Sequence, residues 1–531
     1  MAKKHLLILF IAGILVAFSA SRFQHTAGYM DAEYYYAGGI QLYQGQGLTE
    51  NYLWNYLDNP ASLPHPAFAY WMPLPSLLAA AGMELFGSSG LDAARALFLL
   101  LDGLIPVLVA LLAYSFTKKP FHAYIAALLS IFSGFYLIYA SIPETFLLSM
   151  ALGTVFILIV ENLKFRDRSF SLDYLWCAVL GLCAGLLHVN RADGVVWLAA
   201  GVALILFYVI KNKIPFATCL ASMFLLVAGY AAVMGFWYFR NWSVYHSLFP
   251  PGNSLTLFLV NYDQTFLYPA SQLTLGSWLS SGWQAILQVR LDSLVQNLKN
   301  LLAVQGEIFL LPLIIVGCWK LRKELRVQIA LAMWLLVFLV MTFVFPFAGE
   351  RGGFIHSGAA LQPVFWAVTP VGLESLVEVG VKRRHWSRQA SFRFFSTGVV
   401  MLAVALSAGL FLNRVIGSDS AHPIWDEIEV QYSAISAQMA QDSAASNDIV
   451  MVKNPPGWYL AADGPAIVIP DGDAATVLAV ANRYGAQYLV LDRDHVSSLD
   501  AVYNGTERPD FLKLLFSSGD IQVYRIDTTQ Q

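Results

Sequence analysis

Long apolar runs, separated by polar connections, fill most of the chain as far as residue 412. A helix needs about 20 apolar residues to cross a bilayer, and fewer where neighbouring helices support it. The pattern therefore predicts about eleven membrane-spanning helices. The predicted spans are Leu6–Ala20, Ala94–Phe116, Phe121–Tyr139, Thr145–Val160, Leu172–Leu187, Gly194–Ile210, Phe216–Phe239, Leu301–Trp319, Val327–Phe347, Ala359–Val379 and Thr397–Leu412.

Two connections are too long to be simple turns, and we expect both to carry structure of their own. Residues 22–92, here called the first long loop, contain the apolar stretch Tyr70–Phe86, whose first turn two prolines interrupt. An interfacial or half-buried helix is expected there, because a full span would invert the charge pattern of every later connection. Residues 240–300, the second long loop, are rich in aromatic residues, proline and serine, and Leu279–Leu298 is predicted to be helical.

The composition changes after Asn413, where the apolar runs give way to a polar region with frequent turn residues. Four short segments there predict strands, and a helical segment lies between two of them. The expected strands are Asp448–Val452, Ala466–Ile469, Gln487–Leu491 and Ile521–Ile526, and the expected helix is Ala474–Tyr484. The sequence thus predicts a mainly α membrane core over residues 1–415, followed by a small α/β domain over residues 420–531.

Lysine and arginine are spread unevenly over alternate connections, and this distribution sets the expected orientation. One set of connections carries basic clusters, namely Lys3/Lys4, Lys118/Lys119, Lys164/Arg166/Arg168, Lys211/Lys213, Lys320/Arg322/Lys323/Arg326 and Lys382/Arg383/Arg384/Arg388/Arg393. The other set carries single basic residues only. Connections rich in lysine and arginine usually face the cytoplasm. We therefore expect a multi-pass protein of the cell inner (plasma) membrane, with a cytoplasmic amino terminus and an extracytoplasmic C-terminal domain. The opening segment is interpreted as a retained anchor rather than a cleaved signal peptide.

The composition agrees with this class of protein. Apolar residues make up 57% of the chain and charged residues 13%, about half the share found in soluble globular domains. The net charge of −3 argues against a nucleic-acid partner. All four cysteines lie in apolar runs without metal-ligand spacing, so they are interpreted as small core residues.

Asp31 is the leading candidate for chemistry. It follows the opening helix and lies in a loop that is expected at the membrane surface, where a carboxylate can remove a proton from an attacking hydroxyl or amine. Apolar surroundings would raise its pKa toward a useful range. The competing interpretation is a helix N-cap, in which Asp31 caps the segment Ala32–Leu42 and Glu33 occupies its first turn.

Three further candidates fall at predicted outer ends of spans. Glu144 follows Pro143 at the start of a span, where it is either a second acid of the site or part of an ordinary helix start. Arg191 and Asp193 lie in the turn Asn190–Gly194. Arg191 can bind a phosphate through its planar fork of donors, or it can pair with Asp193 and close the turn.

The remaining basic candidates lie later in the chain. Arg240, in the sequence Phe-Arg-Asn-Trp, could hold a diphosphate, although a side chain that reaches toward the membrane surface is the favoured interpretation. The glycine-rich stretch Gly349–His356 allows close backbone approach, and its Arg351 and His356 could neutralise a leaving phosphate. The alternative for this stretch is a flexible turn with a solvated Glu350–Arg351 pair.

The first long loop also carries a wider pattern. After the opening helix come Asp31, Tyr34, Tyr35, Gly38-Gly39, Leu42, Gly45-Gln46-Gly47-Leu48, His65-Pro66, Trp71-Met72-Pro73-Leu74-Pro75 and Leu85-Phe86-Gly87. This arrangement resembles the first outer loop of the GT-C glycosyltransferases, especially the protein O-mannosyltransferases and the lipid A aminoarabinose transferases. The resemblance covers roughly Leu6 to Leu412, and its motifs are individually short.

The resemblance implies a fold and a function. It implies a polytopic helical core of the GT-C type in which an acid of this loop is the base or a metal-site residue, and that role falls to Asp31. Many relatives have adjacent Asp and Glu. Here Ala32 intervenes, so whether Glu33 takes the place of the second acid stays open. Tyr34 could stack on a sugar, although aromatic residues are common at any membrane surface.

The resulting hypothesis is a glycosyltransferase that moves a sugar from a polyprenyl-phosphate donor to a lipid, glycan or protein acceptor on the extracytoplasmic face, with inversion. Asp31 and Glu144 are the expected catalytic residues. The expected substrate-binding residues are Glu33, Tyr34, Arg191, Asp193, Arg240, Arg351 and His356. No cofactor is required by this hypothesis, but a divalent cation held by Asp31 and Glu144 is an open alternative. A lipid or sugar transporter without transferase activity is the rival class.

Overall fold

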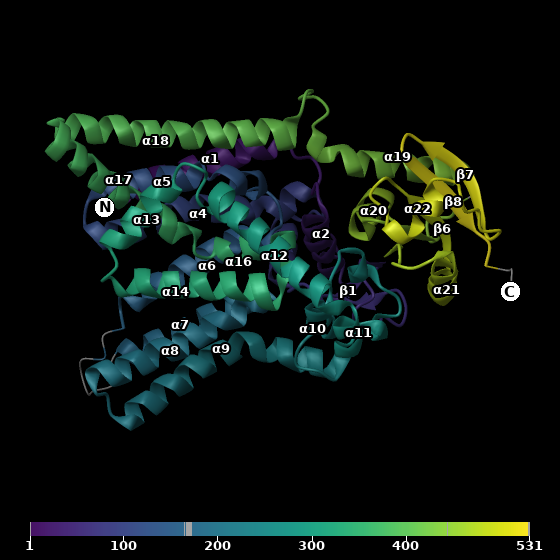
Figure 1. The fold of residues 1–531 in the computed structure, drawn as a ribbon, viewed down its shortest axis with the longest axis horizontal. Coiled ribbons are helices and arrows are strands. Elements are labelled where there is room, and N and C mark those ends of the chain that lie inside the picture. Colours follow the sequence, from purple (N-terminus) through teal and green to yellow (C-terminus); the bar gives the residue numbers. More distant parts are fainter. Residues whose placement is uncertain (1, 164, 166–171, 443, 529–531) are drawn as a thin grey trace.

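The computed structural model describes residues 2–163, 165, 172–442 and 444–528, and Figure 1 shows its helices side by side along the long axis of the molecule. Within these ranges, eight helices are long and apolar enough to cross a membrane. They are α1 (Lys3–Ser21), α4 (Leu91–Thr117), α7 (Leu172–Asn190), α8 (Val195–Asn212), α9 (Phe216–Tyr245), α14 (Leu325–Leu339), α17 (Gln362–Arg384) and α18 (Arg388–Phe411). The apolar span of α14 continues through the adjoining helical turn to Val344. The prediction of a multi-pass helical core is confirmed.

The three other predicted spans form shorter apolar helices: α5 (Pro120–Ile131), α6 (Thr145–Val160) and α13 (Leu311–Lys320). The expected span Leu301–Trp319 is interrupted, because the turn after Gln305 gives Glu307 and Ile308 positive φ angles before α13 begins. Pro312 lies in the first turn of α13 and has no backbone N–H to donate. It therefore favours the start of a new helix over continuation of the preceding helical segment Leu301–Gln305.

Close packing between helices relies on small residues. In α7 and α9, Gly181 and Gly229 each lie so near the backbone of the partner helix that an added Cβ would stand 2.0 Å and 2.2 Å from a carbonyl oxygen. Together with α8, these two helices form a separate layer at the lower side of Figure 1, while α18 runs along the upper side. The predicted basic cluster at residues 164, 166 and 168 lies outside the described residues.

The two long loops fold over one end of the bundle. The first contains α2 (Met30–Tyr43), α3 (Leu74–Phe86) and the short strands β1 (Thr49–Glu50), β2 (Tyr52–Leu53) and β3 (His65–Pro66). The second contains α10 (Pro251–Leu255), α11 (Leu275–Ser280) and α12 (Gly282–Asn300). The expected helices Tyr70–Phe86 and Leu279–Leu298 therefore exist as α3 and α12, with shifted boundaries.

The C-terminal domain is an α/β unit at the same end, next to α2 (Figure 1). Its six-stranded sheet has the order β2-β5-β4-β6-β8-β7. The strands after β2 are β4 (Ile449–Val452), β5 (Ala466–Val468), β6 (Ala486–Leu491), β7 (Leu512–Ser518) and β8 (Ile521–Ile526), and the main helices are α19 (Glu427–Gln441), α20 (Pro455–Ala462) and α21 (Ala474–Tyr484). The four strands and the helix expected from the sequence are confirmed, whereas β7 was not expected.

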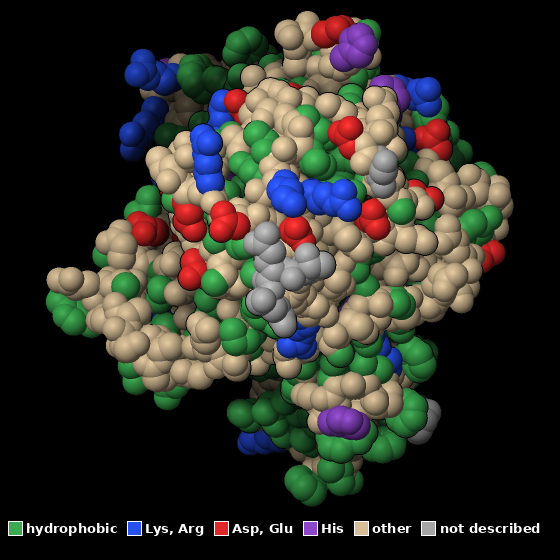
Figure 2. Space-filling view, turned by 90° about the vertical axis from the view of Figure 1, so that its right-hand side faces the viewer, with side chains coloured by type: hydrophobic (Ala, Val, Ile, Leu, Met, Phe, Trp, Pro, Cys, Tyr) green, Lys and Arg blue, Asp and Glu red, His purple; other side chains and the backbone are tan. Residues whose placement is uncertain are grey.

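One strand of this sheet comes from the other end of the chain. Tyr52 and Leu53 of β2 pair in parallel with Ala466 and Ile467 of β5, so the first long loop completes the C-terminal sheet. Charged side chains of both signs are spread over the face of this domain that Figure 2 shows. The domain is thus polar on its surface and joined to the membrane core through backbone hydrogen bonds.

Candidate active site

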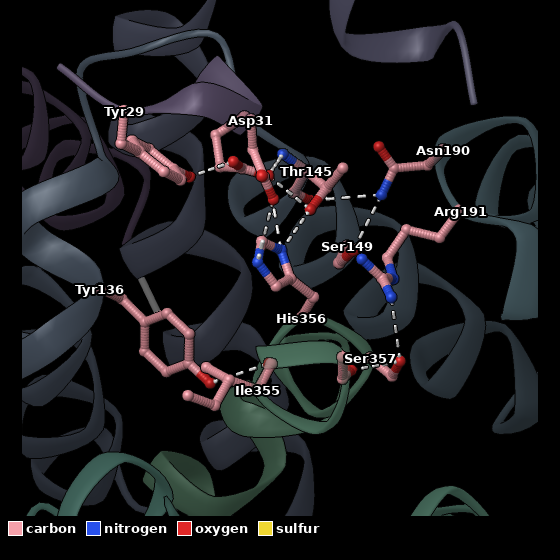
Figure 3. A network of polar contacts seen from close by, with 12 residues as sticks. Tyr29, Asp31, Tyr136, Thr145, Ser149, Asn190, Arg191, Ile355, His356 and Ser357 are labelled. Atoms are coloured by element: carbon pink, nitrogen blue, oxygen red, sulfur yellow. Dashed lines mark hydrogen bonds and ion pairs between the residues drawn. The ribbon is translucent and has the colours of Figure 1, made fainter. Parts of the chain in front are cut away.

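Two acids and one histidine meet where the first long loop covers the helical bundle (Figure 3). Asp31 lies in the first turn of α2, Glu144 precedes α6, and His356 lies in α16 (Phe354–Ala359). The His356 imidazole stands 3.8 Å from an Asp31 oxygen through Nε2 and 3.5 Å from a Glu144 oxygen through Nδ1. Three segments that are far apart in the sequence thus place three polar side chains together, and we call them the acid cluster.

Local structure fixes each member. The N-cap of α2 is Tyr29, so the interpretation of Asp31 as a helix cap is wrong, and its carboxylate is free to face the cluster. Glu144 does cap its helix, because one of its oxygens accepts hydrogen bonds from the backbone and hydroxyl of Thr145. The other oxygen accepts from the Tyr29 hydroxyl. The His356 ring stacks on Phe146 with ring centres 4.1 Å apart.

The two carboxylates have different electrostatic surroundings. Burial and the neighbouring charge of Glu144 raise the pKa of Asp31 to about 6. Burial also opposes ionisation of Glu144, but the charge of His356 and hydrogen bonds from His356, Tyr29 and Thr145 hold its pKa below the usual value. Paired carboxylates with separated pKa values are typical of sites in which one acid exchanges protons while the other stays ionised.

Arg191 lies beside the cluster. Its guanidinium donates to Asp193 over 2.9 Å, which is the local pair that the sequence offered as an alternative, and also to the Ser357 hydroxyl over 3.5 Å (Figure 3). Ser357 follows His356 directly. The neighbouring Asn190 amide donates to Ser149 in α6 and so ties the turn to the helix that Glu144 caps. Arg191 is therefore paired but adjacent to the acids.

Arg351 approaches from the other side. It lies in the segment Gly349–Gly353, which is kinked because Arg351 and Gly352 have non-helical backbone angles. Gly352 has a φ of 108°, and an added Cβ there would stand 3.6 Å from the His356 ring. The Arg351 guanidinium stacks on Tyr262 of the second long loop, 3.8 Å from the ring centre. A φ of 108° favours glycine, so Gly352 permits the chain to turn after Arg351, whereas a Cβ there would meet the His356 ring only at an ordinary contact distance.

Aromatic rings surround the acids. Burial and the charge of Asp31 raise the pKa of Tyr70 to about 12, and the same two causes, with Glu144, raise the pKa of Tyr35 well above its usual value. The electrostatic effect of the acids therefore extends to both rings. Such rings can stack on the apolar face of a sugar while their hydroxyls stay neutral donors.

Three of the expected substrate-binding residues do not reach the cluster. Glu33 is fully buried, and one of its oxygens accepts a 2.6 Å hydrogen bond from Asn454 of the C-terminal domain. Tyr34 is also buried and bonds to Glu50 and to the backbone of Phe68. Arg240 is buried as well and donates to the backbone of Ala67 over 2.6 Å, so it neither contacts the cluster nor reaches toward the membrane surface.

The position of Glu33 makes a prediction about stability. Burial raises its pKa to about 8, against an ordinary value of 4.5. Because the folded protein holds this proton where the unfolded chain releases it, the free energy of unfolding should fall as pH rises from 4.5 to about 8, by up to about 1.4 kcal/mol per pH unit. The Glu33→Gln variant should match the wild type in thermal melts at pH 5 and be the more stable protein at pH 9.

The control for this prediction is Glu427→Gln, which changes an exposed glutamate of α19. It should follow the wild type at every pH. A Glu33→Gln variant with the same pH dependence as the wild type would show that Glu33 is already ionised in the folded protein.

The acid cluster also fits a divalent cation. One ligand atom from each of Asp31, Glu144 and His356 lies within 4.8 Å of the other two, and within the described ranges this is the one such group. Two carboxylate oxygens and an imidazole nitrogen suit zinc, manganese and related ions. Tyr29 and Thr145, which bond to Glu144, would hold that ligand in place from behind.

Sequence reasoning missed Tyr29 and Thr145, which bond to Glu144, and Tyr70 and Tyr262, whose pKa values the charge of Asp31 raises. Tyr29 and Thr145 are direct neighbours of segments that were singled out. Thr145 was already the first residue of a predicted span, and a predicted helix start at Met30 would have drawn attention to Tyr29. Tyr70 and Tyr262 carry no such signal, since nothing in the local pattern shows that the two long loops meet.

No protein-family model matches the chain, and no curated protein matches it either. Solved structures do. ArnT from Cupriavidus metallidurans, bound to undecaprenyl phosphate, is 13% identical with a TM-score of 0.55, covering 99% of this chain and 98% of that one. The Archaeoglobus fulgidus oligosaccharyltransferase AglB, with an inhibitory peptide and a dolichol-phosphate, is 12% identical with a TM-score of 0.55, covering 92% and 69%. A complex of the Archaeoglobus fulgidus oligosaccharyltransferase with zinc and sulfate is 11% identical, with a TM-score of 0.53 over 97% and 72%. At these identities the likeness establishes a shared fold.

Proposed function

The chain has the GT-C fold, and from that premise we propose that it is a membrane glycosyltransferase that uses a lipid-phosphate sugar donor. The observation that carries the proposal is the meeting of Asp31, Glu144 and His356 at one end of the helical bundle, beneath the long loops. Two structures with this fold hold a polyprenyl-type lipid phosphate, which supports a donor of the same class here.

In the proposed reaction, Asp31 orients the acceptor nucleophile and accepts its proton as the nucleophile attacks the anomeric carbon. The bond from that carbon to the phosphate oxygen breaks, and its electron pair leaves with the phosphate. Attack from the side opposite the leaving group inverts the anomeric configuration. Arg191 lies beside the acids and supplies positive charge toward the phosphate. His356 would add to that charge only in a site where its imidazole holds no cation. Glu144 keeps the imidazole of His356 in place and assists Asp31.

The proposal includes a divalent cation bound at the acid cluster. Two carboxylates with one imidazole leave excess negative charge where a phosphate anion has to approach, and a cation would remove that repulsion. Asp31, Glu144 and His356 are the residues that would hold it. A carboxylate has two oxygens, so Asp31 keeps one for the acceptor while the other serves as a ligand.

The alternation of basic residues supports an orientation in which the cluster lies on the extracytoplasmic side of the inner membrane. The donor would then enter from the outer leaflet, and the acceptor would be a lipid, glycan or protein reachable from that side. The rival transporter function predicts movement of the lipid without chemistry.

Incubation of the purified protein with labelled polyprenyl-phosphate sugars and a panel of acceptors tests the proposal. We expect label to move to at least one acceptor, with release of the unlabelled lipid phosphate. Membrane passage of the labelled lipid in vesicles, with the sugar still attached and no product in any acceptor panel, would support the transporter instead.

A further inference from the structure

Two cations from distant parts of the chain stand against one aromatic ring. The guanidinium carbon of Arg351 lies 3.8 Å from the centre of the Tyr262 ring, and the Lys453 ammonium lies 5.1 Å from the same centre. Lys453 also lies 5.4 Å from the Phe266 ring. Arg351 belongs to the membrane core, Tyr262 to the second long loop, and Lys453 to the C-terminal domain. Like charges gathered in this way repel one another, and nearby anions reduce that repulsion.

Lys453 lies at a place in the C-terminal sheet where α/β domains commonly bind ligands. It follows β4 directly, and β4 pairs in parallel with β5 on one side and β6 on the other. The chain runs from β4 to β5 and then crosses to β6, so the direction of winding reverses at β4. In open α/β sheets, ligands bind beyond the carboxyl ends of the strands at such a reversal.

Neither cation is neutralised by a direct ion pair in the part of the chain that the structure describes. Lys453 donates to the backbone oxygen of Asp494, while the carboxylates of Asp263, Asp492 and Asp494 act on it from further away. Burial of the Lys453 ammonium lowers its pKa, and these carboxylates oppose that effect. A half-buried lysine and an exposed arginine are thus left with N–H donors for a ligand.

This pair adjoins the acid cluster. Arg351 precedes Gly352, which packs against the His356 ring. The charge of Asp31 also reaches Tyr262, whose pKa is raised by burial and by that carboxylate and lowered by Arg351. The Tyr262 ring is therefore in contact with Arg351 and within the electrostatic reach of Asp31.

We infer that Lys453 and Arg351 together bind the phosphate of the lipid donor, with Tyr262 holding both cations beside it. This inference rests on the proposed function and adds a residue of the C-terminal domain to its donor site. When the bond between the anomeric carbon and the phosphate oxygen breaks, the electron pair adds a negative charge to the phosphate. The two cations stabilise that charge, so the C-terminal domain takes part in the transfer rather than only covering the site.

Binding measurements on the full-length protein test this inference without any sugar transfer. The probes are inorganic phosphate and a polyprenyl monophosphate in detergent, and the variants are Lys453→Gln, Arg351→Gln and Lys453→Arg. Each glutamine variant should bind the polyprenyl phosphate about tenfold or more weakly, because a charge-assisted contact is lost. Lys453→Arg should keep most of the affinity. Lys513→Gln, which removes an exposed lysine of β7 that pairs with Asp527, is the matched control and should bind like the wild type.

Other results of the binding measurements would overturn the inference. Wild-type affinity in a folded Lys453→Gln variant would overturn the inference, as would an equal loss in Lys513→Gln. If Lys453→Gln fails to fold, two other measurements decide the question. They are the affinity of Arg351→Gln, which changes an exposed residue, and the salt dependence of lipid-phosphate binding in Lys453→Arg.

In transfer assays the glutamine variants should raise the KM for the donor and leave the KM for the acceptor unchanged. A raised acceptor KM alone would assign the cations to the acceptor. Asp31→Asn should still bind the lipid phosphate, so failure of the transferase proposal and failure of this inference give different results.

Discussion

Replacement of Asp31 by asparagine should reduce sugar transfer by about 10²- to 10⁴-fold while the protein still inserts and folds normally. The change keeps the size of the side chain and removes its charge and its ability to accept a proton. Asp31 has no cap to lose, because Tyr29 begins α2, so a structural role does not explain such a loss. The measurement is the initial rate of transfer from a labelled polyprenyl-phosphate sugar.

The matched control is Glu84→Gln, which removes an exposed carboxylate from α3 of the same long loop. It should transfer sugar at the wild-type rate. Unchanged transfer in Asp31→Asn would reject the site, and a cysteine at position 31 that reagents reach only from the cytoplasmic side would reject its proposed location. A fall in both variants would point to damage of the loop rather than to chemistry.

The apolar runs were sufficient to predict the helical core, since a segment that is apolar on all sides has few options besides a buried or lipid-facing helix. The break in the predicted span Leu301–Trp319 shows what the length of an apolar run leaves out. The positive φ angles at Glu307 and Ile308 lie between Gly306 and Pro312, two local signals that a prediction from run length passes over. The sixth strand, β2, depends instead on a contact between the first long loop and residues more than 400 positions later.

The acid cluster was predicted in part for a related reason. Asp31 and Glu33 were both candidates, but residues two apart on a helix point to nearly opposite sides, so only one of them can face the site. In the structure Asp31 faces Glu144 and His356, while Glu33 faces Asn454. Both acids lie in the first turn of α2, and the local sequence does not fix which of them faces the site.

Removal of divalent cations should also abolish transfer. This prediction tests whether the acid cluster holds a cation that the reaction needs. Without a cation, the two carboxylates would repel the phosphate of the donor, because Arg191 beside them is already paired with Asp193 and offsets little of their charge. Treatment with a chelator should reduce the rate to background, and added manganese, magnesium or zinc should restore it. Binding of the ion can be followed separately, by calorimetry on the metal-depleted protein.

His356→Ala should raise the cation concentration needed for half-maximal activity by about 100-fold or more, since even an outer-shell partner of a ligand is worth about 10- to 100-fold in affinity. His422→Ala, which removes an exposed histidine close to the C-terminal domain, should leave that concentration unchanged. Full activity after chelation would remove the cation from the mechanism and leave Asp31 as the base. An unchanged cation requirement in His356→Ala would instead exclude His356 as a ligand, and the imidazole would then serve the leaving phosphate alone.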